Sequence, residues 1–108
     1  AWLDCTLPGL DRRTRDAFWR LSEAPGSTRR LGWDSPSPDG SGSAADVLSS
    51  RAAGHTGFTG TSLWIDPAPP DGRGPLIAVL LSNRVHPTRT GTGIAAVRQA
   101  FHRAAVRL

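Results

Sequence analysis

The chain has 108 residues, 38% of them hydrophobic, which is enough for one modest domain or for part of a larger one. Its 13 basic residues are all arginine, and they give a net charge of +4 and an isoelectric point near 11.3. The arginines lie scattered among aspartates, with no run longer than a pair, so the charge does not indicate a nucleic-acid site. The longest uninterrupted apolar run, residues 76–81, is far shorter than the about 20 residues of a membrane span.

Several residue types are rare or absent, which excludes an internal disulfide and indicates that the sequence is not a primary translation product. Cys5 is the single cysteine, so no internal disulfide can form. The sequence contains no Lys, no Tyr and no Met, not even at position 1. We therefore expect a processed product or a fragment of a longer protein, in which any secretory signal would lie outside the sequence given.

A short helix is predicted over residues 11–21. Asp11 can cap its N-terminus, and Phe18 and Leu21 share one face with Thr14. The Ala-Pro-Gly sequence that follows ends the helix, because proline and glycine both break helices.

Residues 29–33 are predicted to form a short strand. Residues 34–46, rich in Ser, Pro and Gly, have no apolar side chain larger than that of Ala to anchor them. We therefore expect a flexible loop, which we extend over residues 34–53.

Two strands are predicted further along, over residues 61–66 and 76–82. The Pro- and Gly-rich sequence between them predicts an antiparallel hairpin with a long loop. The second strand is a continuous apolar run, which suggests that both of its faces are buried.

The clearest helix is predicted over residues 94–108, after an irregular connector. Its apolar stripe consists of Ile94, Val97, Phe101, Ala104 and Leu108. The side chains expected to face solvent are Arg98, Gln99, His102, Arg103 and Arg107. The element order predicts an α+β fold in which one helix covers one face of a small sheet. The other face would lie bare, which suggests that part of the chain is missing.

Two glycine-rich segments, residues 53–66 and 91–96, could in principle bind phosphate or a dinucleotide. A phosphate-binding P-loop needs a lysine, and the chain has none. Residues 91–96 match the Gly-x-Gly-x-x-Ala pattern of dinucleotide sites, but a long connector replaces the tight turn that the pattern requires, so a loop before a helix is favoured.

Two further site types would use His55, in the first of these segments. A triad of Ser62, His55 and Asp66 is disfavoured, because four residues of strand separate the serine from the aspartate. A zinc site from His55, His86 and His102 fits no compact ligand spacing. We expect no metal and no cofactor.

The sequence "GHTGFTGTSLWIDP" resembles the third active-site motif of the serine β-lactamase and penicillin-binding-protein superfamily, more closely that of class C β-lactamase-like serine hydrolases. The Lys-Thr-Gly or His-Thr-Gly of that motif would here be His55-Thr56-Gly57. "PLIAVLLSNRVHP" and the helix after it are similar to the family's last strand, its connector (Asn83, Arg84, Pro87) and its C-terminal helix. "RRLGWD" resembles the strand that often precedes the motif.

The resemblance implies the terminal antiparallel strands and closing helix of a β-lactamase-like fold. It also implies that the Phe58 N–H is an oxyanion donor, that Gly57 lets the substrate approach the backbone, and that Thr56 binds a substrate carboxylate. His55 replaces the usual Lys, and histidines change charge near neutral pH, which favours an ester or peptide over a β-lactam as substrate.

The family's nucleophile and base come from Ser-x-x-Lys, and a tyrosine usually follows in Tyr-x-Asn. A chain without Lys and Tyr contains neither motif. The resemblance thus implies that residues 1–108 are the C-terminal part of a bacterial serine hydrolase, an esterase, D-Ala-D-Ala peptidase or β-lactamase-like enzyme. The part alone would be inactive.

The expected partners are a small acyl substrate (ester, amide or β-lactam) and the upstream part of the same polypeptide, without nucleic acid or a membrane span in this segment. A periplasmic or secreted location follows from the resemblance alone. The alternative function is a non-catalytic binding module, either a degenerate family member or a small basic interaction domain.

Overall fold

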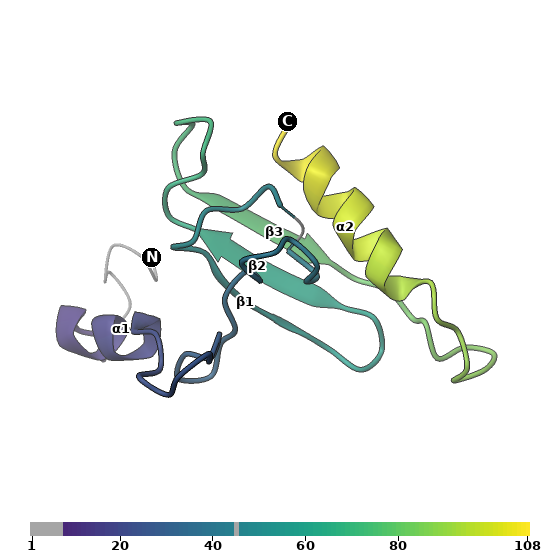
Figure 1. Ribbon diagram of the computed structural model, residues 1–108, viewed down its shortest axis with the longest axis horizontal. Coiled ribbons are helices and arrows are strands. Elements are labelled where there is room, and N and C mark those ends of the chain that lie inside the picture. Colours follow the sequence, from purple (N-terminus) through teal and green to yellow (C-terminus); the bar gives the residue numbers. More distant parts are fainter. Residues whose placement is uncertain (1–7, 45) are drawn as a thin grey trace.

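A computed structural model of the chain describes residues 8–44 and 46–108, so the prediction for Cys5 falls outside the described residues. Two helices and three strands follow one another along the chain (Figure 1). In order they are α1 (Arg12–Trp19), β1 (Ala53–Thr56), β2 (Ser62–Asp66), β3 (Leu76–Leu80) and α2 (Ile94–Ala105). The predicted α+β class is confirmed, as are the two predicted helices and the β2–β3 hairpin.

The three strands form an antiparallel sheet in the order β1-β2-β3. At its centre Gly54 lies opposite Trp64, and Trp64 lies opposite Ala78. The small partners on either side leave room for the indole, and a Cβ on Gly54 would collide with the Trp64 ring. This packing accounts for the first glycine of the stretch without any catalytic role.

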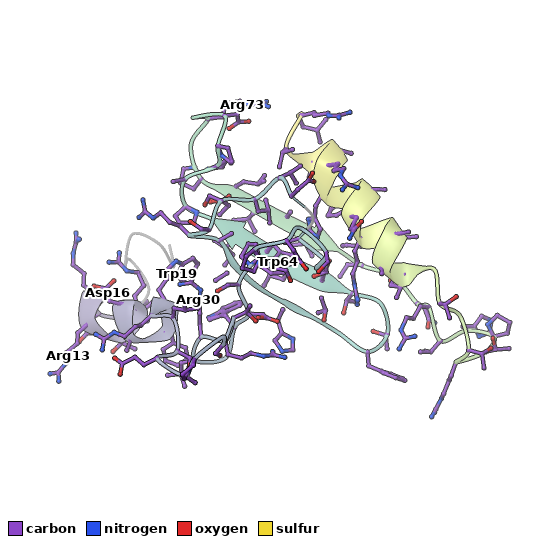
Figure 2. All side chains as sticks on the ribbon, viewed as in Figure 1. Arg13, Asp16, Trp19, Arg30, Trp64 and Arg73 are labelled. Atoms are coloured by element: carbon purple, nitrogen blue, oxygen red, sulfur yellow. The ribbon has the colours of Figure 1, made fainter. Side chains whose placement is uncertain are left out.

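One face of the sheet carries the core. Trp64 projects into the middle of the molecule (Figure 2) and is 3% exposed. It packs against Ala44, Leu48 and Ala52 from the segment before β1, while α2 lies over β3 on the same side (Figure 1). The predicted loop, residues 34–53, contains no helix or strand in its described part before Ala53, where β1 begins. It nevertheless supplies three of the four buried residues in the cluster around Trp64.

The opposite face of β3 is uncovered among the described residues. Ile77 is 61% exposed, Val79 is 51% exposed and Leu81, at the next alternate position, is 80% exposed. Burial of this strand on both faces was therefore a wrong expectation, because no described segment packs on its second face. The predicted bare sheet face is therefore found at β3 only, because Ile65 of β2, opposite Ile77 on the same face, is 7% exposed.

Helix α1 begins as predicted, since the Asp11 carboxylate accepts a hydrogen bond from the Thr14 N–H at 2.7 Å. Phe18 and Leu21 are nevertheless exposed. The helix is attached through Trp19, whose indole N–H donates to the Arg51 carbonyl at 3.0 Å. The predicted apolar face of α1 thus lies outward.

Arg30 lies beside Trp19 in Figure 2 and joins α1 to two loops. Its guanidinium donates to the carbonyls of Trp19 and Ser50 and to the Ser35 hydroxyl. Burial lowers the pKa of Arg30, but an arginine remains charged because its pKa starts so high. The hydrogen bonds of Arg30 and of the Trp19 indole thus connect α1 to the rest of the fold.

The predicted strand over residues 29–33 was wrong. The segment turns back on itself, with the Arg30 N–H donating to the Trp33 carbonyl at 2.9 Å. Gly32 lies between them at a φ of 78°, a conformation that suits glycine in a tight turn. Only isolated bridges remain, and one of them pairs Asp34 with Gly54 of β1.

The inward face of α2 also differs from the prediction. His102 is fully buried and Arg98 is partly buried, although both were expected to face solvent. Val97 and Leu108, expected on the buried stripe, are 51% and 100% exposed. The helix therefore presents charged and polar groups to the sheet, for a reason that lies in the site described next.

Candidate functional site

The site lies at the outer edge of β1. The Asp34 N–H donates to the Gly54 carbonyl at 2.7 Å and the Gly54 N–H donates to the Asp34 carbonyl at 3.0 Å, so this edge is paired at Gly54. The backbone groups of Thr56 point the same way, because alternate residues of a strand share a hydrogen-bonding edge. No described residue pairs with Thr56 on that side, which leaves the end of β1 open to an extended ligand.

A tight turn follows β1. The Gly57 N–H donates to the Thr61 carbonyl at 2.8 Å and the Gly60 N–H donates to the Gly57 carbonyl at 3.0 Å. These two bonds define a three-residue hairpin loop, residues 58–60, whose last position favours a left-handed glycine. Gly60 has a φ of 101°, as this geometry requires.

Phe58 occupies the first position of the turn. Its N–H donates to none of the described residues, whereas its carbonyl accepts a hydrogen bond from the Arg84 Nε at 2.6 Å. The phenyl ring is 64% exposed, and the Arg84 guanidinium lies 4.7 Å from its centroid. Phe58 thus offers a free backbone donor and an exposed aromatic face at the open end of β1.

The remaining glycines of the stretch have steric reasons of their own. A Cβ on Gly57 would collide with the Thr61 hydroxyl across the turn. A Cβ on Gly60 would collide with the Ser82 hydroxyl and approach Ile94 to 3.0 Å. The regular spacing of the glycines therefore arises from three separate close contacts, counting that of Gly54 with the indole.

His55 and Thr56 project on opposite sides of β1, as consecutive strand residues do. His55 is exposed, and both residues border a cavity of about 280 Å³. The residues lining it are Arg29, Asp34, Ser43, His55, Thr56 and Trp64. Across this cavity Arg29 and Asp34 form an ion pair with an N–O distance of 3.6 Å, so a polar ligand would meet both signs of charge.

The disfavoured triad is absent. The Asp66 carboxylate is fully buried and accepts hydrogen bonds from the Ser49 N–H at 2.7 Å and the Ser49 hydroxyl at 2.6 Å. Ser62 is also buried, with its hydroxyl 3.4 Å from the His102 Nε2, while His55 lies on the other face of the sheet. These groups hold the fold together and do not form a nucleophilic centre.

No group of three metal-ligating side chains occurs in residues 8–44 and 46–108. His102 is enclosed by aromatic rings, with its ring centroid 5.0 Å from that of Phe101 and 6.5 Å from that of Trp64. Burial, and then the nearby Arg98, lower the pKa of His102 to about 4. His102 is therefore neutral at physiological pH.

Comparison with protein families gives one match. The sequence model described as Beta-lactamase matches residues 6–102. The chain belongs to this family. A comparison with curated proteins gives no match, and neither does a comparison with solved structures.

Membership of the β-lactamase family confirms the resemblance found in the sequence and makes a serine hydrolase the general class. Of the four residues expected at the site, which are consecutive in the sequence, His55 and Thr56 end β1, and Gly57 and Phe58 begin the turn after it. The structure adds Arg84 and Arg98, which sequence reasoning did not place there. None of the described helices is long and apolar enough to cross a membrane.

Proposed function

We propose that this chain is the C-terminal part of a serine hydrolase and forms one wall of its active site. The substrate is a small ester or amide that is bound along the open edge of β1. The nucleophilic serine and its base come from an upstream part of the same polypeptide, because residues 1–108 contain no lysine for Ser-x-x-Lys.

The observation that carries this proposal is the Phe58 N–H. It lies just beyond Thr56, where the outer edge of β1 has no partner among the described residues. The carbonyls of its turn all accept hydrogen bonds, and none of the described residues accepts a hydrogen bond from the Phe58 N–H. A backbone donor fixed in place before the reaction is what an oxyanion hole requires, since it stabilises negative charge without reorganising. The second donor would be the N–H of the nucleophile itself.

The reaction proceeds through an acyl-enzyme. The serine Oγ forms a bond to the substrate carbonyl carbon as its proton passes to the base, and the carbonyl oxygen becomes the oxyanion that Phe58 stabilises. Collapse of this intermediate breaks the bond to the leaving alcohol or amine, which takes up the proton. Water then repeats the sequence at the acyl carbon and releases the acid.

Ester or peptide hydrolysis fits the site better than β-lactam hydrolysis. At the position before Thr56 the family usually has a lysine, and here an exposed histidine borders the polar cavity. The lysine ammonium that would hold a β-lactam carboxylate is therefore missing at this position. The Thr56 hydroxyl remains as a neutral donor for a substrate carboxylate.

The exposed apolar face of β3 supports the assignment as part of a larger domain. Three large aliphatic side chains, Ile77, Val79 and Leu81, are more than half exposed on one face. A sheet buries its apolar face against another layer in a stable domain. We propose that the upstream part of the polypeptide supplies this layer.

An active-site-directed probe tests the proposal in the complete polypeptide. We expect a fluorophosphonate to form a covalent adduct with one serine upstream of Ala1, detected by mass spectrometry of tryptic peptides. A penicillin probe should label more slowly, since the site favours esters or peptides. If neither probe forms an adduct under any condition, the chain is a non-catalytic binding module.

A further inference from the structure

Every backbone carbonyl in the turn after β1 accepts a hydrogen bond. The turn comprises residues 57–61, and its own N–H groups satisfy only the carbonyls of Gly57 and Thr61. The other acceptors would face solvent in a free hairpin. Two arginines from distant parts of the chain contact them instead, and both come from outside the sheet.

Arg98 reaches the turn from α2. Its Nη2 donates to the Gly57 carbonyl at 2.8 Å and to the Thr61 carbonyl at 3.0 Å, and its Nε donates to the Gly60 carbonyl at 3.2 Å. The planar guanidinium suits this task, because it presents five donors in fixed directions. One side chain thereby fixes both ends of the turn and its left-handed glycine.

Arg84 reaches the turn from the connector after β3. Its backbone N–H donates to the Thr59 carbonyl at 2.8 Å, and its Nε donates to the Phe58 carbonyl at 2.6 Å. Its guanidinium also lies against the Phe58 ring, in a cation–π contact. The peptide groups on both sides of the Thr59 Cα are thus held by one residue.

These two cations converge although they repel each other. Burial lowers the pKa of Arg98, and the charge of Arg84 lowers it further. No carboxylate of residues 8–44 and 46–108 forms an ion pair with either side chain. Partial burial of like charges without a counter-ion is unfavourable. The charge-assisted hydrogen bonds that both guanidinium groups make to the turn offset this cost.

We infer that Arg98 and Arg84 are positioning residues that lock the turn after β1 and thereby aim the Phe58 N–H into the active site. This inference rests on the proposed function, in which that N–H is an oxyanion donor. The two arginines act through the backbone and do not touch the substrate. Loops are ordinarily the more mobile parts of a fold, whereas an oxyanion donor needs placement within about 0.5 Å.

The test compares Arg98→Lys with Arg103→Lys in the complete polypeptide. Both substitutions lie on α2 and keep the charge, but the exposed Arg103 side chain bonds only Asp46 among the described residues, at 3.2 Å. A lysine at position 98 cannot bond three carbonyls in fixed directions. We expect its acylation rate constant to fall about 10- to 100-fold with KM changed little, as for other misplaced catalytic groups. Arg103→Lys should leave both constants unchanged.

Hydrogen exchange of the peptide containing residues 57–61 supplies an independent measurement. We expect faster exchange of the Gly57 and Gly60 amides in Arg98→Lys, while the amides of β3 keep their exchange rates. Arg84→Lys provides a second variant away from the helix, with the same expected direction, should the helix variant lose its fold.

The outcomes separate the two claims. Unchanged exchange in both variants overturns the locking of the turn, and faster exchange with an unchanged acylation rate overturns its role in positioning. If the unmodified protein forms no acyl-enzyme, the proposed function fails. The exchange measurement then still decides whether the arginines lock the turn.

Discussion

The two hairpin connections of the sheet are stabilised in opposite ways. The turn between β1 and β2, residues 57–61, is short, and two arginines and its own amides satisfy all of its carbonyls. The loop between β2 and β3, residues 67–75, lies at the other end of the sheet (Figure 1) and contains four prolines and two glycines. Among the described residues its one internal backbone bond joins the Gly72 N–H to the Pro69 carbonyl, at 3.1 Å.

The two connections differ in how their backbone conformation is restricted. Proline restricts the longer loop through covalent geometry, which limits the backbone without aiming any particular group. The short turn is restricted by hydrogen bonds from two other segments, which fix the direction of each peptide group. Only the second kind of restraint suits a backbone donor that must point at a reacting atom.

The largest effect is expected from removing the Phe58 N–H. Phe58→Pro deletes the donor at the first position of the turn, where proline fits the backbone of common turns. We expect the acylation rate constant in the complete polypeptide to fall about 10²- to 10³-fold, as for loss of one oxyanion donor elsewhere. Single-turnover kinetics with a chromogenic ester measures it.

Phe58→Ala is the matched control, because it removes the exposed ring and keeps the N–H. Its acylation rate constant should stay within about tenfold of the unmodified value, the range of one modest lost contact. Equal losses in the two variants would show that the ring, and not the backbone donor, carries the role of Phe58 in the reaction.

Each hairpin connection contains one glycine with a positive φ, and these two glycines allow a direct comparison of the connections. Gly60→Ala combines an unfavourable φ with collisions at Ser82 and Ile94, so we expect a loss of about 2 to 4 kcal/mol in unfolding free energy. Gly72 has a φ of 73° and no atom within 4 Å of an added Cβ. Gly72→Ala should therefore lower the unfolding free energy only through its unfavourable φ, by about 1 to 2 kcal/mol.

Urea denaturation of both glycine variants measures these losses. A similar loss of unfolding free energy in the two variants would mean that Ser82 and Ile94 move aside at little cost to accommodate the added Cβ. The contrast between a rigid turn and a loosely packed loop would then be wrong.

Acid is expected to weaken the end of the sheet where α2 meets β2. His102 is neutral in the folded chain, with a pKa of about 4, whereas a histidine in the unfolded chain has a pKa near 6.5. Between these values the unfolded state binds more protons, so stability falls as the pH decreases from about 6.5 to about 4. His102 then becomes a buried cation beside Arg98, which holds the turn.

We expect the melting temperature to fall by several degrees over this interval. His102→Gln, which has no charge to gain, should flatten that part of the profile. A profile that is unchanged by the substitution would assign the acid sensitivity to carboxylates elsewhere and would separate the turn from His102.

The sequence predicted the elements better than their packing. Helix α2 and strands β2 and β3 have clear apolar patterns, and the resemblance to a known family located the His-Thr-Gly strand. The inward face of α2 was wrong, because apolar periodicity places arginine and histidine in solvent. Arg98 turns inward to reach carbonyls, and no pattern along the helix reveals acceptors contributed by a turn some 40 residues earlier.

The segment before β1 was misjudged for a related reason. Its Ser-, Pro- and Gly-rich composition predicted a flexible loop, yet Ala44 and Leu48 are buried against Trp64. The Trp64 indole lies between Gly54 and Ala78 in the sheet, and alanines of the preceding segment fill the space above it. Composition alone does not show that such a space exists.

The smallest effect is expected at the proline-rich loop. The Arg73 guanidinium donates to the Val106 carbonyl at 2.7 Å, just beyond the C-terminus of α2, where a cation also interacts favourably with the helix dipole. Arg73→Ala should lower the unfolding free energy by only about 0.5 kcal/mol, because the side chain is more than half exposed. The acylation rate constant should not change. A loss of rate like that expected for Arg98→Lys would show that this loop also controls the site. In that case α2 would transmit a change at its C-terminus to the turn that Arg98 holds.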